Sequence, residues 1–189
     1  MSRKEAVLSF VWQHALLLVS IYLMTLGVVL CIKSDLGSSV ISSLPLSLSI
    51  AGARGLAPAL TVGGYTIVMN FVLVGLQIAV LRSRFNPMQL SQLVIGFVFG
   101  WLIDINMMLT DWLECATVIS RIATQFAGCA VMGVGIALEV RCGSVAMPGE
   151  GFPVALSRVT GVAFPRVKIV VDTVLVVLAV VSSYLFFGR

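Results

Sequence analysis

The stretch of sequence that decides the fold is LGSSVISSLPLSLSI, residues 36–50. It is uncharged and nearly long enough for a membrane span, but it contains six serines, a glycine and a proline. Such a stretch makes a poor lipid-facing helix, because irregular backbone at membrane depth is tolerated only where protein or water covers it. We therefore predict a dip into the membrane that is followed by a half-helix buried against protein.

A second stretch of the same kind, CGSVAMPGEGFPVAL, occupies residues 142–156. Sliding the chain by 106 residues aligns 27–55 with 133–161 without gaps, and the order helix, break, half-helix, helix recurs. The identical pairs in this alignment are Gly27 with Gly133, Val28 with Val134, Gly37 with Gly143, Ser38 with Ser144, and Gly55 with Gly161. The pattern indicates an internal repeat, and the alternative is a chance overlap of two Gly/Ser loops.

The composition places the chain in a membrane. Of its 189 residues, 59% are hydrophobic and 11% are charged, and the mean hydropathy is +1.10. A soluble domain is about 45–50% apolar and about 25% charged, so we expect an all-α integral membrane protein. Disorder, a disulfide scaffold and nucleic-acid binding are excluded. Four dispersed cysteines and a single histidine predict no metal site and no cofactor.

Five runs of the chain are apolar enough to cross a bilayer, which takes about 20 residues of helix. The predicted spans cover roughly 8–32, 61–82, 88–110, 116–139 and 166–187. We expect one transmembrane domain over 1–189, with repeat A at about 8–82, a linker helix at about 88–110 and repeat B at about 116–187. The two broken segments are then re-entrant half-helices, one inside each repeat, which start near Leu44 and near Phe152.

The lysines and arginines predict the orientation of these spans. A cytoplasmic N-terminus with five spans puts eight of them inside and four outside, which favours N-in and C-out. The inside group is Arg3, Lys4, Arg82, Arg84, Arg141, Arg158, Arg166 and Lys168, and the outside group is Lys33, Arg54, Arg121 and Arg189.

The span count also sets the symmetry of the repeat. The fourth span lies three spans after the first, so the two halves cross the membrane in opposite directions. Inverted repeats with discontinuous helices near the midplane are typical of many transporters. The sequence therefore predicts a pathway for a solute.

Four short elements carry a resemblance to a known family. They are SDLGSS at 34–39, SLP at 43–45, GWLID at 100–104 and MPGEG at 147–151. Together they resemble the YczE/YyaS/YitT group of bacterial multi-pass membrane proteins over nearly the whole chain. The resemblance implies a helical protein of the bacterial inner (plasma) membrane. One member of that group is associated with the production of secreted natural products, which suits export or an accessory role. The C-terminal cytosolic domain of the YitT branch has no counterpart here, so we expect no regulatory function of that kind.

The predicted binding site lies between the two broken segments. A half-helix that begins inside the membrane presents N–H groups and the positive end of its macrodipole, so two converging N-termini favour an anionic group. The candidate residues are Gly37, Ser38, Ser39, Ser42 and Ser43 in one half, and Gly143, Ser144, Gly149 and Glu150 in the other. An ionised Glu150 would instead favour a zwitterion or a cation. The alternative is that the serines merely cap half-helices in a packed bundle without a ligand.

Two acids are candidates for proton or ion coupling. Asp104 lies inside the third span, where a carboxylate usually faces a cavity or a partner, and the alternative is a hydrated acid near the outer surface. Asp172 follows Lys168 by four residues in the weaker orientation for a helical ion pair, so it is expected to reach towards interfacial water.

These observations favour a small transporter or channel-like protein for a small polar solute, either anionic or zwitterionic. The alternative is an accessory or scaffold protein that supports an enzyme or exporter and has no substrate of its own. We do not expect an enzyme, because the sequence shows no nucleophile–base pair, metal-ligand set or phosphate-binding loop.

Expected partners are the lipid bilayer, a small-molecule or ion ligand, and at least one more copy of the chain, since five spans are few for enclosing a pathway. Gly96 and Gly100 predict close helix packing, within the bundle or between protomers.

Overall fold

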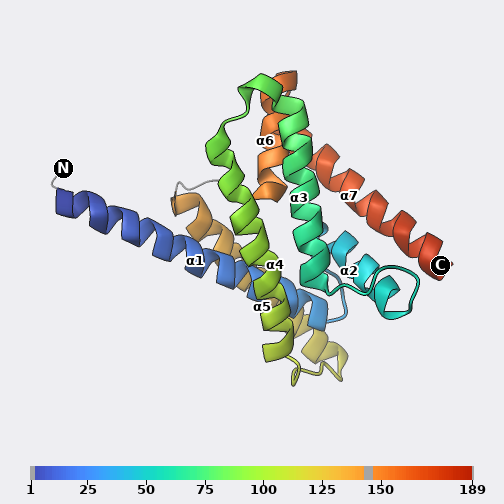
Figure 1. Ribbon diagram of the computed structural model, residues 1–189. Coiled ribbons are helices and arrows are strands. Elements are labelled where there is room, and N and C mark those ends of the chain that lie inside the picture. The colour runs from blue at the N-terminus through green and yellow to red at the C-terminus, as the bar shows by residue number, and fades with distance from the viewer. Residues whose placement is uncertain (1–2, 143–146, 189) are drawn as a thin grey trace. The chain divides into compact units, whose positions relative to one another are not determined.

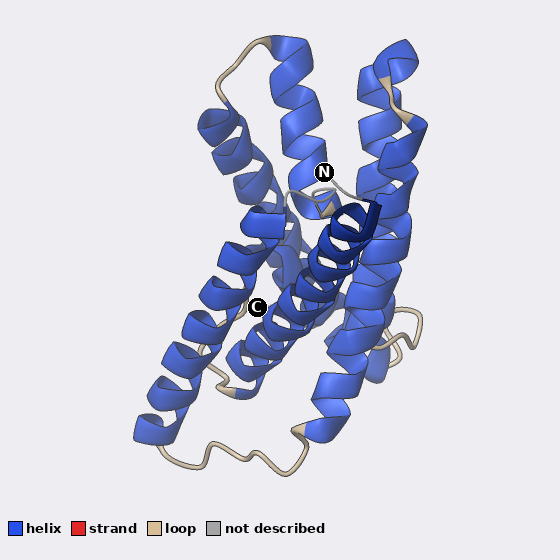
Figure 2. Ribbon diagram, turned by 90° about the vertical axis from the view of Figure 1, so that its left-hand side faces the viewer, coloured by secondary structure: helices blue, strands red, loops and turns tan. Residues whose placement is uncertain are grey.

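The computed structural model describes residues 3–142 and 147–188, and over these residues every regular element is a helix (Figures 1 and 2). The all-α prediction is confirmed. The elements in chain order are α1 (Arg3–Lys33), α2 (Val40–Ala53), α3 (Val62–Leu81), η1 (Arg82–Arg84), η2 (Pro87–Leu90), α4 (Ser91–Leu109), α5 (Val118–Cys142), α6 (Pro148–Thr160) and α7 (Phe164–Phe187), where η marks a 3-10 helix.

Five helical segments are long and apolar enough to cross a membrane, as predicted, so the chain is a membrane-embedded protein. They are Trp12–Lys33, Val62–Leu81, Pro87–Leu109, Val118–Cys142 and Phe164–Phe187. Four of the five end within a residue or two of the predicted boundaries. The helix expected to end at 139 continues to Cys142, where Arg141 in the last turn suits the negative end of the helix.

The two broken segments each contain a short helix. Helices α2 and α6 have 14 and 13 residues, which corresponds to about 21 and 20 Å. Neither length reaches across a hydrocarbon core of about 30 Å. The chain therefore follows the order long, short, long twice, as α1–α2–α3 and as α5–α6–α7, with α4 between the two series.

The short helices begin four residues earlier than predicted, at Val40 and Pro148 instead of near 44 and 152. The starts differ because an N-cap and an N-terminal proline set them, and the apolar stretch begins only later in each helix. The start of α2 is set by Ser39, whose side chain accepts the N–H of Ser42 as an N-cap. The start of α6 is set by Pro148, because the fixed φ of proline suits the first helical position.

Contacts divide the chain into two compact units. The first unit contains α1 with the residues up to Gly37, and continues from Ile105 through α5. The second unit contains 38–104 together with 147–188, which includes α2, α3, α6, α7 and most of α4. Each unit thus takes helices from both predicted repeats.

In the first unit α1 and α5 pack against each other in opposite directions. A Cβ added to Gly27 would lie 2.7 Å from the Gly128 carbonyl oxygen, and one added to Gly135 would lie 2.9 Å from the Met24 nitrogen. Residue numbers therefore rise along α1 as they fall along α5. Small residues let the two backbones approach this closely.

In the second unit the short helices pack on long ones. Helix α2 packs on α7 and α3, and α6 packs on α3 and α7 (Figure 1). The apolar core there consists of Met69, Leu73, Val167, Val171 and Leu175, with Ile41, Phe152 and Leu156 packed against it. Gly96 and Gly100 lie against α3, since a Cβ on Gly63 would collide with the Gly100 carbonyl oxygen. The predicted close packing thus occurs within the chain.

Candidate functional site

The first turns of α2 and α6 contact each other. A Cβ added to Gly149 would lie 2.7 Å from Cδ1 of Ile41, and each of these residues is the second in its helix. Ile41 and Phe152 both pack against the apolar core on α3 and α7. Two helix N-termini therefore meet inside the second unit, where the sequence placed the solute site.

Serine hydroxyls surround the start of α2. The Ser39 hydroxyl accepts the Ser42 N–H, and the Ser38 hydroxyl donates to the Ser42 hydroxyl at 3.1 Å. Ser39 and Ser42 also make a hydroxyl–hydroxyl contact, while Ser43 donates to the Val40 carbonyl oxygen at 2.7 Å. Ser42 is buried and Ser38 is half-buried. This arrangement caps α2, as the alternative interpretation predicted, and leaves solute binding by these serines a prediction.

The start of α6 is built differently. The N-cap residue Met147 makes no side-chain capping hydrogen bond, and the N–H groups of Glu150 and Gly151 both donate to the Met147 carbonyl oxygen, at 2.9 and 2.8 Å. Glu150 is half-buried in this turn, and no hydrogen bond or ion pair joins its side chain to another described residue. Of the remaining predicted site residues, Gly37 is exposed in the segment that follows α1, and Gly143 and Ser144 lie outside the described residues.

The buried side-chain amides of two glutamines, Gln77 and Gln92, lie against the first turn of α6. A Cβ added to Gly151 would lie 2.8 Å from Oε1 of Gln77, and 2.8 Å from both Oε1 and Nε2 of Gln92. The two glutamines are 1% and 2% exposed, and neither Oε1 atom has a hydrogen-bond partner among the described residues. A buried acceptor without a donor is costly, so the two oxygens are candidates for hydrogen bonds to a bound molecule.

The predicted site includes neither glutamine. Both lie in spans that are identified by their lack of charge, and the polar candidates there were the charged residues. The signal was present in the sequence. An amide inside a membrane span needs hydrogen-bond partners as a carboxylate does, although its transfer to hydrocarbon costs less.

A groove of about 340 Å³ opens beside the first residue of α2. Its lining residues are Val40, Ile169, Asp172, Thr173, Val176 and Val177. Asp172 pairs with Lys168 at 2.9 Å, in place of the expected reach towards water alone. Both side chains are about a quarter exposed, so the pair retains some contact with the surroundings.

Asp104 lies at a different helix start. Its carboxylate accepts the Thr61 hydroxyl at 2.6 Å and the Gly63 N–H at 2.9 Å, which places it at the N-terminus of α3. A negative charge is stabilised there by the helix dipole. Gln77 lies on α3, 14 residues after Gly63, which corresponds to roughly 21 Å along the helix axis. Asp104 is therefore not part of the site at α6, and its role in coupling stays a prediction.

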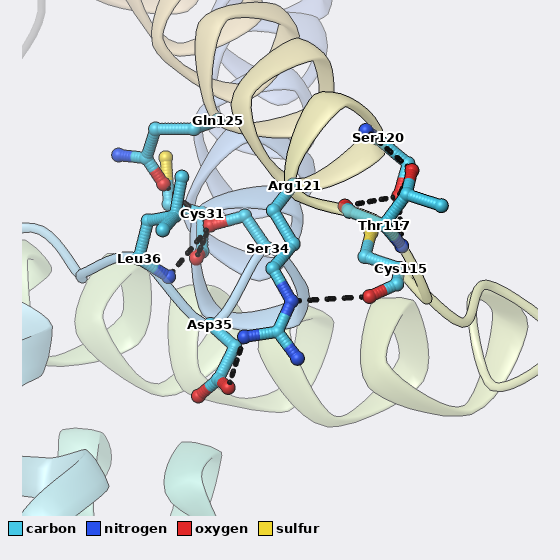
Figure 3. Close-up of polar contacts among 9 residues, drawn as sticks. All are labelled: Cys31, Ser34, Asp35, Leu36, Cys115, Thr117, Ser120, Arg121 and Gln125. Atoms are coloured by element: carbon cyan, nitrogen blue, oxygen red, sulfur yellow. Dashed lines mark hydrogen bonds and ion pairs between the residues drawn. The ribbon is translucent and has the colours of Figure 1, made fainter.

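In the first unit, polar contacts join the end of α1 to the start of α5 (Figure 3). The Ser34 hydroxyl lies 2.6 Å from Oε1 of Gln125, and Arg121 bonds Asp35 at 3.0 Å and the Cys115 carbonyl oxygen at 3.1 Å. A further ion pair, from Lys33 to Asp111 at 3.2 Å, lies at the same end of α1. These contacts fix the turn that leads out of α1.

The residues that the structure describes contain no group of three His, Cys, Asp or Glu side chains placed to hold a metal ion. The groups at the two helix starts offer hydrogen bonding and charge: serine hydroxyls at α2, and two buried amide oxygens and the Glu150 carboxylate at α6. Such a set can bind a small polar molecule.

Five membrane-spanning helices, with two short helices whose N-termini meet, define a multi-pass membrane protein with a candidate solute site. The chain belongs to a protein family of unknown function, DUF6198, whose model matches residues 11–189. No curated protein and no solved structure matches the chain. The narrower resemblance to the YczE/YyaS/YitT group stays a prediction.

Proposed function

We propose that this protein is a small membrane transporter or channel-like protein that moves a small polar solute, anionic or zwitterionic, past the first turns of α2 and α6. The observation that carries the proposal is the contact between Ile41 and Gly149, which brings two helix N-termini together. Helix N-termini offer N–H groups and a positive dipole end, and transporters with discontinuous helices use them to bind solutes. The proposal requires no catalytic step.

The pattern of helix contacts supports an inverted repeat. Exchanging α1–α2–α3 with α5–α6–α7 converts the packing of α2 on α7 into the packing of α6 on α3, and both pairs are present. It likewise converts the contact of α2 with α3 into that of α6 with α7, and both are present too. The antiparallel pair of α1 and α5 maps onto itself.

Local details of the two short helices match as well. Pro45 and Pro153 are each the sixth residue of their helix, and both are buried. Beyond the helix ends, Gly55 and Gly161 both adopt the left-handed conformation with φ of 73°, which glycine tolerates best. These two glycines are a pair that the 106-residue alignment matched.

We place the N-terminus in the cytoplasm and the C-terminus outside the bacterial plasma membrane, because eight lysines and arginines then face inwards and four outwards. Five spans per chain favour a dimer or a larger homo-oligomer. Asp172, beside the start of α2, and Asp104, at the start of α3, are proposed to couple transport to a proton or an ion.

The proposal is tested by screening the purified protein in detergent for thermal stabilisation by small metabolites, since a ligand that prefers the folded state raises its stability. We expect at least one small charged solute to stabilise the protein, and Ser38→Leu to abolish the effect without unfolding it. Ser49→Leu, near the end of α2, is the matched control and should respond like the unmodified protein. Full retention of the response in Ser38→Leu would place the solute elsewhere, and absence of any response would favour the accessory role.

A further inference from the structure

We infer that the solute bound at the start of α6 carries an ammonium group, and that this group donates hydrogen bonds to the side-chain oxygens of Gln77 and Gln92. The inference rests on the proposed solute site and narrows its ligand to amine-bearing zwitterions.

The two oxygens point to a donor with more than one hydrogen. Both oxygens lie 2.8 Å from the position that a Cβ on Gly151 would occupy, as does Nε2 of Gln92. The two oxygens are therefore at most twice 2.8 Å apart. Both are buried acceptors without a partner among the described residues. An ammonium group has three N–H donors and fits a pair of acceptors, and hydrogen bonds from a charged donor are about twice as strong as neutral ones.

The charges near the two oxygens attract both charged groups of a zwitterion. Glu150 lies one residue before Gly151, half-buried, with no ion pair to a described residue, and its carboxylate attracts a positive group. The helix N-termini that meet at Ile41 and Gly149 attract a negative group. A simple anion would satisfy the N-termini and leave the two amide oxygens without a donor.

Two other occupants satisfy the same oxygens, a water molecule and a sodium ion, and a matched set of probes separates them. The purified protein in detergent is heated with glycine or alanine, with acetate or propionate, which lack the amine, and with glycine betaine, whose nitrogen has no N–H. Sodium chloride is titrated separately against choline chloride. We expect an amino acid to stabilise the protein, and the carboxylates, the betaine and sodium to have no effect at equal concentration.

Variants then assign the effect to the glutamines. Gln77→Leu and Gln92→Leu should each weaken the apparent affinity for the amino acid by about tenfold or more, because each removes a bond to a charged donor. Gln77→Glu should retain or strengthen binding, because a carboxylate also accepts from an ammonium group. Gln13→Leu, on an exposed part of α1, makes the same chemical change away from the site and is the control.

Equal stabilisation by amino acids and by carboxylates without an amine would overturn the inference and leave the solute site standing. A full response to the amino acid in Gln77→Leu and Gln92→Leu would mean that the oxygens hold only water, and stabilisation by sodium alone would assign them to the ion; each result also overturns the inference. Loss of the response to the stabilising carboxylate or amino acid in Ser38→Leu would show that the proposed solute site stands although the inference fails.

Discussion

Ile41 of α2 and Gly149 of α6 contact each other: each is the second residue of its short helix, and only the lack of a side chain at Gly149 lets the two first turns meet. Counted from the helix starts the two residues correspond, whereas the 106-residue alignment pairs Ile41 with Met147. Both starts belong to the same unit as the apolar core on α3 and α7.

This contact predicts a cross-link. With the four native cysteines replaced, the double variant Ile41→Cys/Gly149→Cys should form an intramolecular disulfide under mild oxidation. A Cβ on Gly149 would lie 3.6 Å from Cγ1 of Ile41, where the new sulfur can sit, and a disulfide needs Cβ atoms about 3.5–4.5 Å apart. The readout is a mobility shift on a non-reducing gel. The control Ser49→Cys/Gly149→Cys places the first thiol eight residues further along α2, roughly 12 Å away, and should stay reduced. Equal cross-linking of both pairs would contradict the packing of the two first turns.

The packing of α3 on α4 predicts opposite effects for two glycines of the same helix. Gly63→Ala should destabilise the protein by about 1–3 kcal/mol, because its Cβ would meet backbone atoms of Gly100 that cannot move alone. Gly75→Ala meets nothing within 4 Å and should be neutral or stabilising by up to about 1 kcal/mol, from helix propensity. Unfolding of each variant in detergent, followed by circular dichroism, measures the difference. A neutral Gly63→Ala would rule out this close approach.

The position of Asp104 predicts an effect on stability that can be separated from a role in proton coupling. Asp104→Asn should lower stability by about 1 kcal/mol, because the helix start of α3 loses a charged acceptor. If Asp104 also couples a proton, the variant should lose the pH dependence of solute binding. Thr61→Val removes the same side-chain hydrogen bond and keeps the titratable group, so its pH dependence should persist. An unchanged pH dependence in Asp104→Asn would limit the carboxylate to capping.

Much of the fold could be predicted from the sequence. Uncharged apolar runs gave the five spans, since a bilayer tolerates few other segments of that length. Glycines, serines and prolines located the two broken segments. The boundaries of the short helices were less predictable, because Ser39 and Pro148 set them and the more conspicuous prolines lie inside the helices. Ion pairs such as Arg121 with Asp35 depend on two helices meeting, and no local pattern encodes that.

The candidate site could be predicted only in part. The first turns of the two short helices contact each other at Ile41 and Gly149, and their entry from opposite leaflets stays a prediction. Gln77 and Gln92 come from α3 and α4 and reach the start of α6 only through packing. Residues far apart in sequence become neighbours through the tertiary fold, so a single sequence without a template does not reveal such a group.

The most direct test of the central claim measures from which side of the membrane the ends of the two short helices are reached. In the cysteine-free background, Arg54→Cys, just after α2, and Arg158→Cys, in the last turn of α6, both replace exposed residues. A membrane-impermeant maleimide should label position 54 from outside the cell, and position 158 only from the cytoplasmic side of inverted vesicles. Labelling of both positions from the same side would contradict the inverted pair of short helices, and with it the solute site between them.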